Sequence, residues 1–126
     1  MTVFLICAGI LGLLAAVLAL NVARMRGKKR ILLGDGGDKE MTAAVRAHGN
    51  LIEFAPLCLL LIYLLHGPYG DRIMTILAAF LVIGRLAHAG GMLGHIPSGR
   101  TIGAVVTVVV LAIASVMLIG AGIRVL

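Results

Sequence analysis

The sequence is poor in polar residues. Charged side chains make up 13% of its 126 residues, whereas hydrophobic residues make up 61% and the mean hydropathy is +1.14. A soluble domain of this length is only about half apolar. The composition therefore argues against a soluble protein and indicates an integral membrane protein.

The sequence also lacks the motifs of several common sites. Its two cysteines, Cys7 and Cys58, lie among apolar neighbours without CxxC or Cys/His spacing, so we expect buried thiols, no disulfide and no metal site. A Ser/His/Asp arrangement and a phosphate-binding glycine loop are both absent, which leaves hydrolytic and nucleotide chemistry without support. The basic residues have no interleaved aromatic residues and lie beside an apolar run, so nucleic acid is not an expected partner.

Four long apolar runs make up most of the chain. Each is close to the ~20 residues that cross a hydrocarbon core of about 30 Å as a helix. A transmembrane barrel would instead need at least about eight short alternating segments. We therefore predict an all-α, four-helix transmembrane bundle that forms one domain over residues 1–126, with helices at about 2–22, 41–66, 72–94 and 101–123. After a glycine-rich turn, Asp38 is expected to cap the second helix.

The basic residues are unevenly placed. Six of them fall in the connection between the first two apolar runs: Arg24, Arg26, Lys28, Lys29, Arg30 and Lys39. By the positive-inside rule, residues 23–40 and 95–100 are cytoplasmic, and both termini lie outside. Because positive charges follow the first run and do not precede it, this run is expected to be a retained helix and not a signal peptide. The basic residues are also expected to attract anionic membrane lipids.

A polar row interrupts the second apolar run in the stretch RAHGNLIEF, residues 46–54. Arg46, Asn50 and Glu53 are spaced at i, i+4 and i+7, so they share one helix face. Glu53 is expected roughly 10–15 Å inside the cytoplasmic boundary, and Arg85 of the third run reaches a similar depth. An acid and a base at this depth usually pair, so we predict a Glu53–Arg85 salt bridge.

Further polar residues gather at the same end. His88 follows Arg85 by one turn, and Arg100 with Thr101 begins the fourth run. A cationic cluster of this kind suits an anionic ligand that carries carboxylates, and an arginine beside a thiol favours the thiolate. Two structural alternatives stay open: the arginines at the ends can extend to lipid phosphates, and His88 can bond between helices. Small-residue pairs at Gly90 and Gly94, and at Gly103 and Thr107, predict close helix packing.

The motifs resemble those of the MAPEG family, the membrane-associated proteins in eicosanoid and glutathione metabolism. The segment RAHGNLIEFAP is similar to the family pattern R-x-x-x-N-x-x-E followed by an aromatic residue and a proline, and both the GDGG turn and GRLAHAGGMLG are similar to those of small bacterial members. The resemblance implies a homotrimer in the bacterial inner membrane. It also implies that glutathione, as a co-substrate, binds between neighbouring subunits on the cytoplasmic side.

The resemblance also assigns roles to residues. Arg100 is expected to stabilise the glutathione thiolate, which makes it the catalytic residue. Residues expected to bind glutathione are Arg24, Arg46, Asn50, Glu53, His88 and Thr101, with Arg26 as the alternative to Arg24. Phe54 and Met92 stand where family members have tyrosines, so two hydroxyl groups are missing.

Three functions are compatible with these residues. The first is a glutathione-dependent transferase or peroxidase that acts on lipophilic electrophiles or lipid hydroperoxides from the bilayer. The second is a non-catalytic lipid-binding or scaffold protein of the same family, which the two missing hydroxyl groups favour. The third is a small proton-coupled exporter with Glu53 as the coupling acid, although pairing with an arginine would make Glu53 a poor proton carrier at neutral pH.

Overall fold

The computed structural model describes residues 1–125 and contains four helices and no strand in that part of the chain. The helices are α1 (Thr2–Lys29), α2 (Lys39–Leu64), α3 (His66–Met92) and α4 (Gly99–Ile123). Each is long and apolar enough to cross a membrane. The predicted all-α membrane fold is therefore confirmed.

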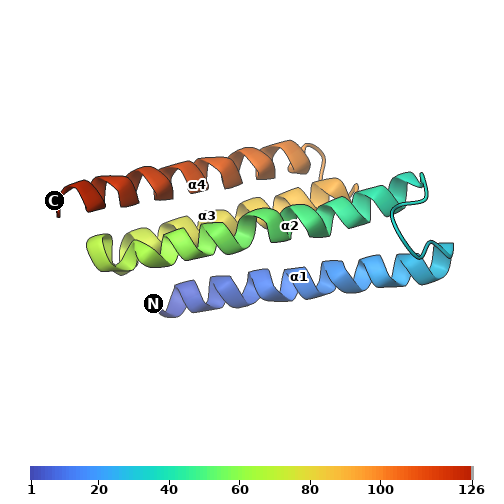
Figure 1. The fold of residues 1–126 in the computed structure, drawn as a ribbon, viewed down its shortest axis with the longest axis horizontal. Coiled ribbons are helices and arrows are strands. Elements are labelled where there is room, and N and C mark those ends of the chain that lie inside the picture. The colour runs from blue at the N-terminus through green and yellow to red at the C-terminus, as the bar shows by residue number, and fades with distance from the viewer. Residues whose placement is uncertain (126) are drawn as a thin grey trace.

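The four helices run side by side along the long axis of the molecule (Figure 1). The α1–α2 and α3–α4 connections lie at one end, and both chain termini lie with the α2–α3 turn at the other. We call the first of these the basic end, because it carries the cationic residues between Arg24 and Lys39. Among the described residues, α1 packs on α2 and α3 but has no contact with α4.

Two helix boundaries differ from the prediction. α1 continues to Lys29 and not to residue 22, because Arg26, Lys28 and Lys29 occupy its last turn, where positive charge is favourable. α3 begins at His66 and not at residue 72, so the expected outer loop is mostly helical. Gly70 interrupts the helical geometry with a φ of 74° and a ψ of −177°, a conformation that costs glycine little, so residues 66–69 form a short helical segment that a kink joins to the main part of α3.

The turn before α2 has the predicted form. Gly34, Gly36 and Gly37 all have positive φ, and the Asp38 side chain accepts a hydrogen bond from the backbone N–H of Met41 at 2.8 Å. This bond satisfies one of the free N–H groups at the start of α2. The expected cap at Asp38 is confirmed.

Glycines allow α3 and α4 to pack at backbone distance. A Cβ atom at Gly103 would meet the carbonyl oxygen of Gly84 and the backbone nitrogen of His88, and one at Gly91 would meet the backbone of Gly99 and Arg100. The predicted role of Gly103 is therefore confirmed. Gly94 is a correction: it lies in the turn with a φ of 79° and has no neighbour that a Cβ would touch, so it shapes the chain reversal and does not pack helices.

Candidate functional site

The polar row on α2 lies on the outer surface of the single chain. Arg46 Nη1 donates to Glu53 Oε1 at 3.3 Å, and the two side chains are 55% and 49% exposed. They are two helical turns apart, so the shared face that we predicted brings them together. A charged pair therefore faces outward from a helix that is otherwise apolar enough to span a membrane.

Arg85 has a different partner from the one predicted. Its side chain is 1% exposed, and its Nη1 donates to Oδ1 of Asn50 at 2.9 Å. The expected Glu53–Arg85 salt bridge does not form within residues 1–125. The physical reason is that Glu53 lies on the exposed face of α2, whereas Arg85 points into the bundle.

The buried guanidinium of Arg85 is only partly satisfied. Its Nε and Nη2 atoms have no hydrogen-bond partner in the described chain. A cavity of about 60 Å³ lies beside it, and its lining consists of Asn50, Phe54, Arg85, Ala104, Thr107 and Val108. A buried charge with one neutral partner is costly, and a cavity of this size beside unpaired donors has room for a water molecule or a small polar group.

His88 lies one turn from Arg85 on the same buried face of α3, as predicted. It is 4% exposed, and its Nδ1 atom has no partner among the described residues. Its backbone lies against Gly103 of α4, so the close packing of α3 on α4 fixes its position. α3 thus carries two buried polar side chains with unused hydrogen-bonding groups.

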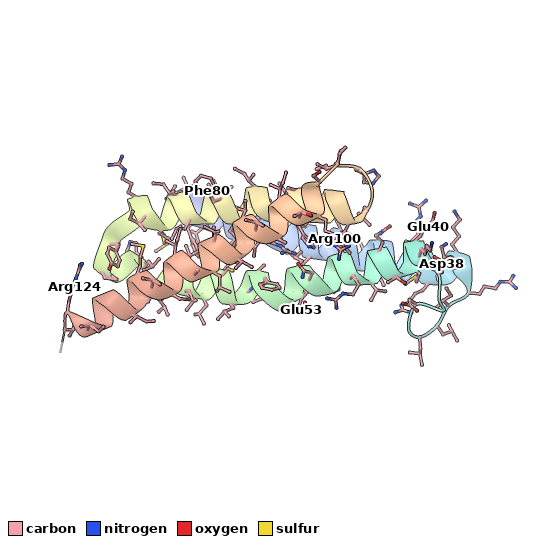
Figure 2. The ribbon with its side chains drawn as sticks, turned by 90° about the horizontal axis from the view of Figure 1, so that it is seen from above. Asp38, Glu40, Glu53, Phe80, Arg100 and Arg124 are labelled. Carbon is pink, nitrogen blue, oxygen red and sulfur yellow. The ribbon has the colours of Figure 1, made fainter. Side chains whose placement is uncertain are left out.

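Arg100 and Thr101 lie in the first turn of α4, where both are exposed and free of side-chain hydrogen bonds to the described chain. Figure 2 shows Arg100 on α4 and Glu53 on α2 at neighbouring levels of the long axis, inward from Asp38 and Glu40. The start of a helix also carries partial positive charge from its free N–H groups. This turn is therefore suited to an anionic group.

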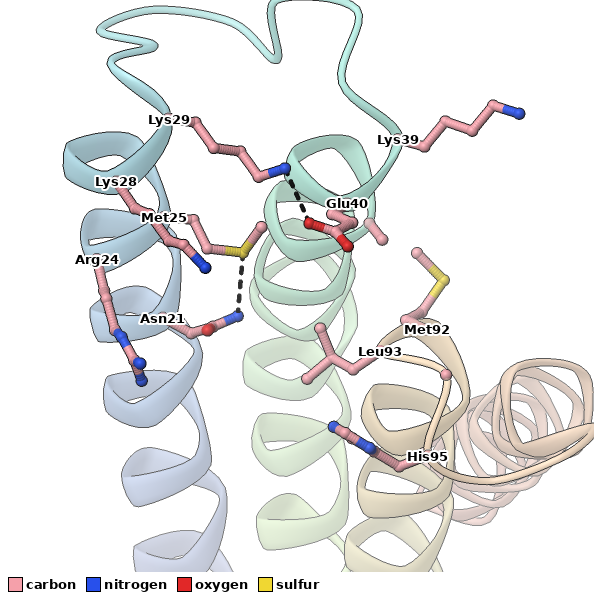
Figure 3. Close-up of a pocket in the computed structure, with 12 residues that line it drawn as sticks. Asn21, Arg24, Met25, Lys28, Lys29, Lys39, Glu40, Met92, Leu93 and His95 are labelled. Atoms are coloured by element: carbon pink, nitrogen blue, oxygen red, sulfur yellow. Dashed lines mark hydrogen bonds and ion pairs between the residues drawn. The ribbon is translucent and has the colours of Figure 1, made fainter.

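Arg24 and Arg26 differ in their contacts. Arg26 Nη1 donates to the carbonyl oxygens of Ile31, Leu32 and Gly34 at 3.3, 3.2 and 3.0 Å, so it holds the connection after α1. Arg24 makes no ion pair or side-chain hydrogen bond within the described residues, and it borders a cavity of about 540 Å³ at the basic end (Figure 3). Of the two, only Arg24 is available for a ligand.

The structure therefore divides the predicted residues into separate groups. Arg46 and Glu53 form a pair on α2, with Glu53 at a level close to that of Arg100 on α4, and Asn50 of the same helix contacts Arg85. His88 is buried where α3 packs on α4. Arg24 stands apart, because α1 and α4 do not touch. Sequence reasoning missed the large cavity beside Arg24, although Asn21, Arg24 and Lys28 recur at helical spacing and mark one face of α1.

The predicted thiols are present as expected: Cys7 and Cys58 are both buried and unpaired. No group of three metal-ligating side chains occurs in the part of the chain that the structure describes. The polar groups are thus mainly cationic hydrogen-bond donors, which suit carboxylate or thiolate groups of a ligand.

Comparison with known proteins places these features in a family. The MAPEG family matches residues 4–120. Inner membrane protein YecN of Escherichia coli K12 is 34% identical over 80 residues, and so is the protein of the same name from Escherichia coli O6:H1. Each alignment covers 63% of this chain and 61% of the relative, so the chain matches less than two thirds of either protein's length. Since the family match extends over nearly the whole bundle, the chain belongs to the MAPEG family.

Proposed function

We propose that this protein is a membrane-bound, glutathione-dependent transferase or peroxidase that acts on lipophilic electrophiles or lipid hydroperoxides. Its membership of the MAPEG family supports glutathione as the co-substrate. The names of the two Escherichia coli relatives support a location in a bacterial inner membrane. With the basic end in the cytoplasm, glutathione reaches the site from the cytoplasm and the second substrate arrives from the bilayer.

The observation that carries this proposal is the exposed Arg46–Glu53 pair. Two charged side chains about half exposed on a transmembrane helix would be costly against lipid, and such residues usually face a bundle interior or an aqueous cavity. A neighbouring subunit that covers α2 would remove this cost and enclose a polar ligand. This supports the homotrimer, in which each interface between subunits holds one glutathione.

The separation of Arg24 from Arg100 supports a shared site. The two arginines lie on helices that make no contact within one chain, yet the family pattern assigns both to glutathione. We infer that they come from different subunits: α1 of one chain supplies Arg24, and α4 of its neighbour supplies Arg100. Arg24 would then bind a carboxylate of glutathione, while Arg46 and Asn50 on α2 orient the peptide.

Arg100 is the proposed catalytic residue. Its positive charge and the free N–H groups of the first turn of α4 would both favour the thiolate over the thiol. The thiolate sulfur then attacks the electrophilic carbon of the second substrate, a new C–S bond forms, and the leaving group departs with the bonding electrons. With a hydroperoxide, the thiolate sulfur attacks the terminal oxygen, an S–O bond forms as the O–O bond breaks, and the alkoxide leaves and takes a proton to become the alcohol. A second glutathione then attacks the sulfenic acid, which gives glutathione disulfide and water.

A second candidate, a non-catalytic lipid-binding protein, is favoured by Phe54 and Met92. Phe54 borders the small cavity beside Arg85, and Met92 borders the large cavity at the basic end. Neither supplies a hydroxyl group to position a substrate. This candidate predicts that lipid binds but that added glutathione gives no thiolate.

The ultraviolet absorbance of the thiolate separates the two candidates. Titration of detergent-purified protein with glutathione should give a saturable signal, and Arg100→Ala should abolish it because the stabilising charge is lost. Arg124→Ala is the matched control, since it removes the same charge from the opposite end of α4. A thiolate signal equal in Arg100→Ala and wild type would refute the role of Arg100, and no signal in wild type would favour the lipid-binding protein.

Mixed trimers test the shared site. Arg24→Ala and Arg100→Ala chains should each be inactive alone. If the arginines act in different subunits, then mixing the two chains in equal amounts restores about a quarter of the sites. Each interface takes its two chains at random, and only one of the possible combinations carries both arginines. No restoration after mixing would show that both arginines act within one chain.

A further inference from the structure

A cavity of about 540 Å³ has, apart from Arg24, no lining residue that the proposed reaction uses. It lies at the basic end between α1, α2 and the end of α3. We propose that it binds the phosphate headgroup of an anionic glycerophospholipid. The family assigns only Arg24 of its lining to glutathione, so the proposal is argued and tested on the other residues.

The charge of the lining favours an anion. Lys29 is neutralised by Asp38 at 2.7 Å and by Glu40 at 2.8 Å. Apart from Arg24, the cations Lys28 and Lys39 border the cavity without an acidic partner within residues 1–125, and Figure 3 shows the Lys39 amine extending away from Lys28 and His95, so Lys28 supplies the free charge nearest to them. The one acid in the lining, Glu40, is the partner of Lys29. The cavity therefore presents uncompensated positive charge.

Several polar groups converge on the same space. Figure 3 shows the amine of Lys28 and the imidazole of His95 extending from opposite sides, from α1 and from the turn after α3, with the amide of Asn21 below Lys28. Ammonium and amide groups, together with a ring N–H, are donors that suit phosphate oxygens. Donors on separate elements can surround a phosphate, whereas residues on one exposed helix face would only attract it.

The depth of the cavity matches the lipid phosphate. α1 has 28 residues, so its length is about 42 Å, which equals the thickness of a bilayer with its headgroups. The last turns of α1, from Arg24 to Lys28, therefore lie at headgroup level when the apolar part of α1 spans the hydrocarbon core. A phospholipid in the adjacent leaflet places its phosphate at that level.

The apolar part of the lining fits the rest of the lipid. Met25, Ala43, Met92 and Leu93 border the cavity together with the cations. The volume lies within the range of about 300–1,000 Å³ that is typical of small-molecule sites. The polar groups can therefore hold the headgroup while the methionines and Leu93 contact the glycerol backbone and the first methylene groups.

Native mass spectrometry of the full chain in detergent tests the proposal, with phosphatidylglycerol titrated against phosphatidylcholine. We expect saturable binding of phosphatidylglycerol and weak binding of phosphatidylcholine. Lys28→Gln should weaken phosphatidylglycerol binding about fivefold, the effect of one basic residue near an anionic lipid surface. Lys28→Arg should retain binding because it keeps the charge. Lys28 is exposed, so these changes leave the packing of the bundle intact.

Arg30→Gln is the matched control, because Arg30 is exposed at the same end and lies outside the cavity. Equal losses in Lys28→Gln and Arg30→Gln would show diffuse attraction to the basic end and overturn the site. Soluble glycerol phosphate tests whether the bound phosphate belongs to a lipid. If glycerol phosphate saturates the cavity while phosphatidylglycerol does not bind, then the proposal of a lipid ligand is wrong. Displacement of the lipid by glutathione would assign the cavity to glutathione, whereas a thiolate signal unchanged in Lys28→Gln would confirm that the two sites are separate.

Discussion

The packing of α3 on α4 makes a sharp prediction at Gly103. The substitution Gly103→Ala places a methyl group where the Gly84 carbonyl and the His88 backbone nitrogen already lie, and 2.7 Å from the Cβ of His88. Carbon atoms prefer a separation of about 3.5–4.0 Å. Two of these obstacles are backbone atoms of α3, so they cannot rotate away, and α4 must move outward by roughly 1 Å.

The magnitude follows from two opposing effects. Overpacking a close contact costs about 1–3 kcal/mol, and a clash with backbone belongs at the upper end of that range. The gain in helix propensity from glycine to alanine offsets at most about 1 kcal/mol. The net loss of about 2 kcal/mol should lower the midpoint of thermal unfolding by about 6–10 °C for a chain of this length.

Thermal unfolding in detergent, followed by circular dichroism, measures this loss. Gly120→Ala is the control on the same helix, because a Cβ there meets nothing within 4 Å, and it should leave the midpoint unchanged or raise it. If Gly103→Ala unfolds at the temperature of Gly120→Ala, then α3 and α4 do not pack at backbone distance and the placement of His88 against α4 is wrong.

Two further predictions concern polar contacts. Asn50→Leu removes the one hydrogen bond of the buried Arg85 guanidinium and should destabilise the protein by about 1.5–3 kcal/mol, whereas Asn50→Asp should retain stability in the same unfolding assay. The ammonium of Lys29, and then the Met41 N–H, hold the pKa of Asp38 below its usual value. The stabilisation is therefore complete above the unfolded pKa of about 3.9 and is lost as the pH falls through the lower folded pKa. Hydrogen exchange at the start of α2 should accelerate over that acidic range in wild type but not in Asp38→Asn, and equal acceleration in both would contradict this role.

The sequence was sufficient for the fold because each helix carries its own signal. Runs of apolar residues of membrane-spanning length predicted all four helices, and Asp38 after a glycine-rich turn predicted the start of α2. The helix boundaries that differed from the prediction depend on residues at the helix ends. The basic last turn of α1 extends that helix into a segment whose polarity predicted a loop, and a short helical segment before the kink at Gly70 occupies part of the predicted loop before α3.

The pairing of side chains was harder to predict, because spacing along one helix does not fix rotation against another. Arg46 and Glu53 lie on one helix, so their shared face was predictable. Glu53 and Arg85 match in depth, but depth leaves the rotation of α2 undetermined, and that rotation turns Asn50 toward Arg85 and Glu53 outward. The cavity at the basic end was similarly hidden, since its lining comes from three helices that are distant in the sequence.

The distribution of acids supports the proposal that the polar level of the bundle binds an anionic ligand. Of the five acids, Asp35, Asp38 and Glu40 lie in or beside the α1–α2 connection, and Asp71 lies 2.8 Å from the amino group of Met1 at the opposite end. Only Glu53 is left to balance the three arginines at positions 46, 85 and 100, so this level carries an excess of two positive charges per chain. Glutathione with an ionised thiol has two carboxylates and a thiolate against one ammonium, a net charge of about −2. A neutral lipid would leave the arginines uncompensated at a depth where isolated charge is costly. Charge balance therefore favours the glutathione thiolate as the ligand at this level and supports the reaction proposed for Arg100.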